Sequence, residues 1–190
     1  MILGAIVGCP TIGGLAGAVQ NPSDTEVEDA RTALERLGGD GALSDALRDD
    51  VVALLTRDAP QYAVELLAAA ASDGPPLETS ADTVVALENL SVALLQCDGD
   101  QHIAPPLALY AVLDAQLLRG APRPMLHQSR FVYVGESATF VAWGAADAER
   151  FAQGLASARR SLAEQIVQSF FVAQTPIKMK WPRCVNQRWK

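Results

Sequence analysis

Apolar residues recur with helical spacing over much of this chain. Between residues 24 and 37 they follow one another at intervals of three and four. Ser23 and Glu26 form a capping box at the beginning of the run, and Gly38 and Gly39 end it. The pattern predicts a helix over residues 24–37.

Four further segments have the spacing or composition of helices. Pro60, Ser80 and Pro105 stand where three of them can begin, because proline and serine are favoured at the start of a helix. The segment that begins at Ser80 is almost wholly apolar, which is typical of a central helix. The predicted helices cover residues 44–57, 60–71, 80–95 and 105–120.

The last third of the chain has a different pattern. Residues 129–134 and 138–143 are rich in β-branched and aromatic side chains, and residues 135–137 between them predict the turn of a hairpin. Residues 2–7 are the natural candidate for a third strand, since two strands alone are marginally stable. A long amphipathic helix is expected from residue 145 to residue 173.

These patterns predict a mainly α fold of the α+β class. We expect a bundle of about six helices, a small antiparallel β-hairpin or three-stranded sheet, and extended terminal arms. A length of 190 residues fits one domain. The expected parts are an apolar N-terminal arm (1–20), a single helical domain with a hairpin near 129–143 (21–173), and a basic C-terminal tail (174–190).

Charge is divided sharply along the chain. All 22 acidic residues lie between Asp24 and Glu164, whereas residues 177–190 hold five basic residues and no acidic one. The rest of the chain has ten basic and 22 acidic residues, so its net charge is −12 beside +5 in the tail. An acidic body repels phosphates, which argues against general affinity of the body for nucleic acid.

The first nineteen residues carry no charged side chain. Pro10 and five glycines interrupt their apolar run, and no basic residue precedes it as in a signal sequence. We interpret this segment as a buried or subunit-contacting arm. A membrane-contacting segment and a signal-like sequence are the alternatives.

Residues typical of catalytic or metal sites are sparse. Three widely spaced cysteines form no disulfide framework and indicate a reducing environment, which favours an intracellular or virion location. Residues 97–102 gather Cys, Asp and His, but their spacing matches neither a zinc nor a calcium site. No glycine motif for phosphate binding occurs. The sequence therefore assigns no metal, cofactor or catalytic residue.

A small enzyme would depend on one of the two histidines, His102 and His127. Cys9, Cys97 or Ser129 could approach either ring and form a pair of nucleophile and base. No activating motif accompanies these residues, so a core or surface histidine is the preferred interpretation.

The C-terminal tail combines basic residues with tryptophan. Such a segment can dock on an acidic protein surface with the indoles as anchors, or bind single-stranded nucleic acid by stacking. An exposed terminus without a partner is the third alternative. The residues expected to bind a partner are Lys178, Lys180, Trp181, Arg183, Arg188, Trp189 and Lys190.

This layout favours a non-enzymatic structural or assembly subunit of a larger complex, for example a viral shell. The subunit would contact protein neighbours, in a homo- or hetero-oligomer, through its terminal arms. The alternatives are a nucleic-acid-associated protein that binds through the tail, and a small enzyme with a site near His127 or His102.

Overall fold

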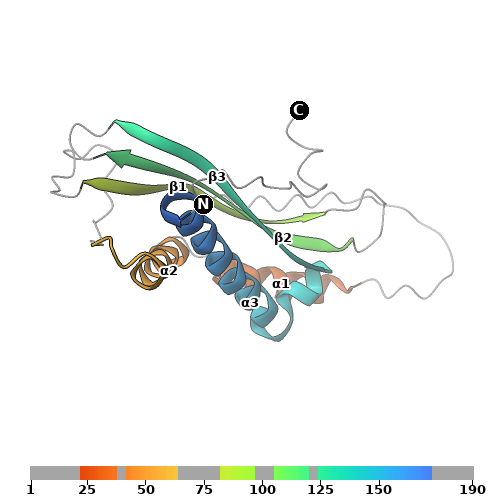
Figure 1. Cartoon of the computed structure of the whole chain (residues 1–190). Helices are drawn as coiled ribbons and strands as arrows, with labels where there is room; N and C mark the ends of the chain where they lie inside the picture. Colours follow the sequence, from red (N-terminus) through yellow and green to blue (C-terminus); the bar gives the residue numbers. More distant parts are fainter. Residues whose placement is uncertain (1–21, 38–41, 64–81, 97–104, 120–123, 173–190) are drawn as a thin grey trace, which may run out of the picture.

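The computed structural model describes residues 22–37, 42–63, 82–96, 105–119 and 124–172. They form two layers, an antiparallel sheet and the helices that cover one of its faces (Figure 1). The strand order is β1-β2-β3, so β2 is central. In chain order the elements are α1 (Asp24–Leu37), α2 (Ala42–Asp58), β1 (Thr83–Gln96), β2 (Leu107–Arg119), β3 (Met125–Ala138), α3 (Phe140–Val167) and a π-helical turn, η1 (Gln168–Val172).

The expected bundle of about six helices is wrong. The described residues hold three α-helices and a three-stranded antiparallel sheet. The segments 80–95 and 105–120, for which the sequence predicts helices, form most of β1 and all of β2 instead. A continuous apolar run fits a buried helix or a strand covered on both faces equally well, so periodicity alone cannot decide between them.

The expected hairpin between residues 129 and 143 is also wrong. β3 continues without a turn through residues 135–137, and Gly135 and Glu136 lie at a bulge where its register against β2 shifts. The Tyr133 ring covers the glycine, since a Cβ on Gly135 would lie 3.0 Å from the ring atom Cε1. The residues that follow enter α3, which begins after the N-cap Thr139.

Other predictions have mixed outcomes. The helix predicted over residues 24–37 is confirmed by α1, and α2 contains the helix predicted over residues 44–57. Residues 60–63 form a turn and bend rather than the start of a helix. The predictions for residues 2–7, 64–71 and both terminal arms lie outside the described residues.

The predicted capping box is present at the start of α1. Glu26 Oε2 accepts from the backbone nitrogen of Ser23 at 2.7 Å, and the backbone nitrogen of Glu26 donates to Ser23 Oγ at 3.2 Å. The hydrogen bond from the Ser23 backbone is the main reason why the pKa of Glu26 is lowered. The side chain of each residue thus accepts a hydrogen bond from the backbone N–H of the other, as in a capping box.

The core lies between α3 and the sheet. Leu109 and Leu113 of β2 are buried on the face that meets the helices, together with Phe131 of β3. Trp143, in the first turns of α3, is also buried, and its Nε1 donates to the backbone carbonyl of Leu107 at 2.7 Å. The start of α3 is therefore joined to the start of β2.

A close contact between helices joins α1 to α3. A Cβ on Gly144 would lie only 2.3 Å from the Cα of Ala30, so only glycine allows this approach. Just after the contact α3 kinks, and Ala146, Asp147 and Ala148 adopt left-handed φ angles of 50°, 55° and 60°. This conformation costs L-residues about 1–2 kcal/mol each, so the surrounding packing must hold it.

We predict that Gly144→Ala lowers the free energy of unfolding by about 1–3 kcal/mol, because the added methyl group forces the two helix backbones apart. The matched control is Gly154→Ala, also in α3, whose Cβ would meet the tip of the Leu109 side chain at 2.8 Å. A side-chain tip can shift, and alanine favours the helix by about 1 kcal/mol, so this variant should stay within about 1 kcal/mol of wild type. Urea unfolding of both variants measures the difference, and equal stabilities would contradict the assigned contact.

Candidate interaction surface

Three parts of the chain meet at one end of the molecule. The turn after α2, the first residues of β3 and η1 bring together a set of aromatic and apolar side chains. Tyr62 lies against Phe171 with 5.3 Å between ring centroids, and His127 lies against Phe170 at 5.6 Å. We call this region the aromatic end; it consists of Tyr62, Met125, Leu126, His127, Phe170, Phe171 and Val172.

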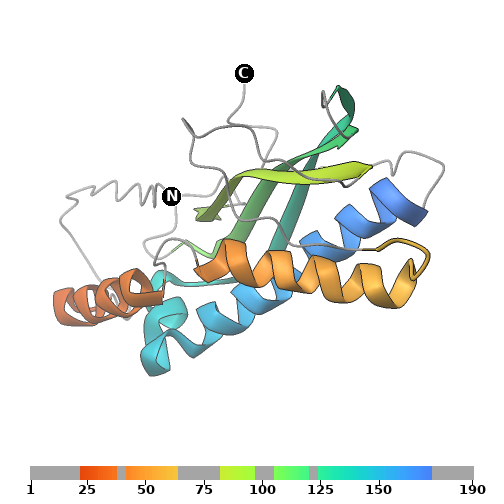
Figure 2. The ribbon, with the colours of Figure 1, turned by 90° about the vertical axis from the view of Figure 1, so that its left-hand side faces the viewer.

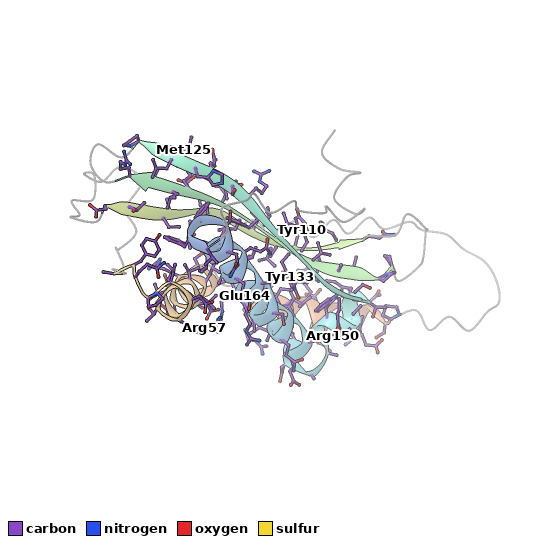
Figure 3. All side chains as sticks on the ribbon, viewed as in Figure 1. Arg57, Tyr110, Met125, Tyr133, Arg150 and Glu164 are labelled. Carbon is purple, nitrogen blue, oxygen red and sulfur yellow. The ribbon has the colours of Figure 1, made fainter. Side chains whose placement is uncertain are left out.

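Exposed apolar side chains concentrate at the aromatic end. The described residues include five exposed large hydrophobic side chains, and four of them belong to this region: Tyr62 (46% exposed), Met125 (57%), Leu126 (48%) and Val172 (47%). Figure 3 shows Met125 at the tip of β3. Exposed apolar side chains that gather in one region are typical of interaction surfaces in soluble proteins.

Local irregularities in the backbone produce this arrangement. The register between β2 and β3 shifts so that Leu117 pairs with His127 and Leu118 pairs with Met125, which leaves Leu126 as an extra residue. At the end of α3 the π-helical turn carries two consecutive phenylalanines. Phe170 contacts Phe131 of β3, and Phe171 contacts Tyr62. The π-helical turn η1 therefore fills the space between β3 and the end of α2.

The Ser–His pair considered from the sequence exists at this end. Ser129 Oγ and His127 Nε2 lie 3.1 Å apart, since residues two apart in a strand share a face. Within the described part of the chain no carboxylate bonds to the imidazole, whereas a catalytic dyad needs a group that orients its base. Cys9, Cys97 and His102 lie outside the described residues.

A polar cluster lies on the sheet face that points away from the helices. Asp114 of β2 accepts from Arg130 of β3 in a bidentate pair, with distances of 2.7 Å to Nε and 3.0 Å to Nη2. Asn89 also donates to Asp114 at 3.4 Å, from a bulge in β1 where it adopts a positive φ of 51°. Beside them Gln116 donates to Glu88 at 3.0 Å.

Hydrogen bonds shift the pKa values of Asp114 and Arg130 in this cluster. Those from the Arg130 guanidinium hold the pKa of Asp114 below its usual range, although partial burial acts in the opposite direction. The pKa of Arg130 is raised by the same contact. Because three donors already bind its oxygens, Asp114 is a cross-strand tie rather than a free base.

We predict that Asp114→Asn lowers the free energy of unfolding at pH 7 by about 1 kcal/mol, since one charge-assisted pair is lost and Arg130 is largely exposed. A depressed carboxyl pKa stabilises the fold above the unfolded-state value and loses that effect as pH falls through the folded-state value. The difference in free energy of unfolding between variant and wild type should therefore disappear as pH falls below about 4. Urea unfolding as a function of pH measures this difference, with the exposed Asp82→Asn as control. A difference independent of pH would contradict the stabilising role of the Asp114–Arg130 pair.

A cavity of about 10 Å³ lies between α2, α3 and the sheet, and its walls are mostly apolar. That volume is comparable to a single water molecule. Within the described residues no group of three or more His, Cys, Asp or Glu side chains is placed to hold a metal ion, and no helix is long and apolar enough to cross a membrane.

The partner-binding residues predicted from the sequence all belong to the tail, outside the described residues, and they remain predictions. The sequence analysis did not find the aromatic end. Its signals are two consecutive apolar residues, Met125 and Leu126, directly after a proline, and the pair Phe170–Phe171 at the end of an amphipathic helix. Val172 is the last described residue, so the basic tail continues from the aromatic end.

No protein-family model, no curated protein and no solved structure matches this chain.

Proposed function

We propose that this protein is a non-enzymatic structural subunit of a larger assembly, and that it contacts neighbouring subunits through its terminal arms. The observation that carries the proposal is the concentration of exposed apolar side chains at the aromatic end, from which the tail continues. A tail with five basic residues and two tryptophans has the composition of an interface anchor.

The use of polar groups supports the same proposal. The described side chains with a shifted pKa belong to three contacts, Ser23–Glu26, Arg57–Asp58 and Asp114–Arg130. Each shift is explained by the contact itself. Catalytic sites instead combine shifted pKa values with a cavity that receives a substrate.

We predict that the full chain forms oligomers and that removal of residues 177–190 lowers their molar mass. Two full-length variants separate the contribution of the tail's charge from that of its tryptophans. One replaces the five basic tail residues by Gln, and the other replaces Trp181 and Trp189 by Ser. Charge attraction is screened over about 3 Å at 1 M salt against about 10 Å at 0.1 M, so salt should also dissociate the oligomers. Sedimentation velocity measures the molar mass of the oligomers for each variant and at both salt concentrations. An unchanged molar mass after truncation would contradict the proposal.

The alternatives give different results in the same samples. A nucleic-acid-associated protein would retain single-stranded DNA through the tail, with an affinity that falls steeply as salt rises. An enzyme with a site at Ser129 and His127 would be labelled at Ser129 by a serine-directed phosphonate, and His127→Gln would abolish the labelling.

A further inference from the structure

We draw no further inference here: the strongest candidate, the group of exposed apolar side chains at the aromatic end, beside the C-terminal end of α3 (Figure 2), carries none because nothing in the described residues shows what covers it.

Discussion

The indole of Trp143 lies where the helical layer and the sheet are joined. Its Nε1 donates to the Leu107 carbonyl at 2.7 Å, its ring meets Phe151 edge-on at 6.3 Å, and the Arg150 guanidinium lies over it at 5.5 Å. A buried indole that lost this acceptor would leave its N–H unsatisfied, which is costly. The contact therefore sets where α3 starts on β2, and the length of α3 then determines that η1 reaches the start of β3.

The glycine contact between α1 and α3 depends on the same placement. Gly144 follows Trp143 directly, so one turn of helix buries an indole in the sheet and offers a bare backbone to α1. This arrangement puts α1 at one end of α3 and the aromatic side chains at the other.

The sequence predicted α1 well because all the determinants of that helix are local: a capping box, regular spacing and two terminal glycines. β1 and β2 could not be recognised in the same way. Their leucines and alanines favour helices as isolated residues, and only pairing between strands far apart in the chain makes them extended. For β3 the sequence predicted extended structure, but the turn at Gly135 was wrong because Tyr133 covers the glycine and β2 continues alongside it. The sequence did not predict the aromatic end for a similar reason, since Tyr62 meets Phe171 and His127 meets Phe170 only after the sheet and helices pack together.

The bulges of the sheet have a consequence for how copies can meet. The extra residues lie in the two outer strands, at Asn89–Leu90 in β1 and at Leu126 and Gly135–Glu136 in β3. A foreign strand needs a regular ladder of backbone donors and acceptors, and each bulge interrupts that ladder. Edge-to-edge growth into cross-β fibrils is thereby discouraged on both sides of an apolar, long-stranded sheet.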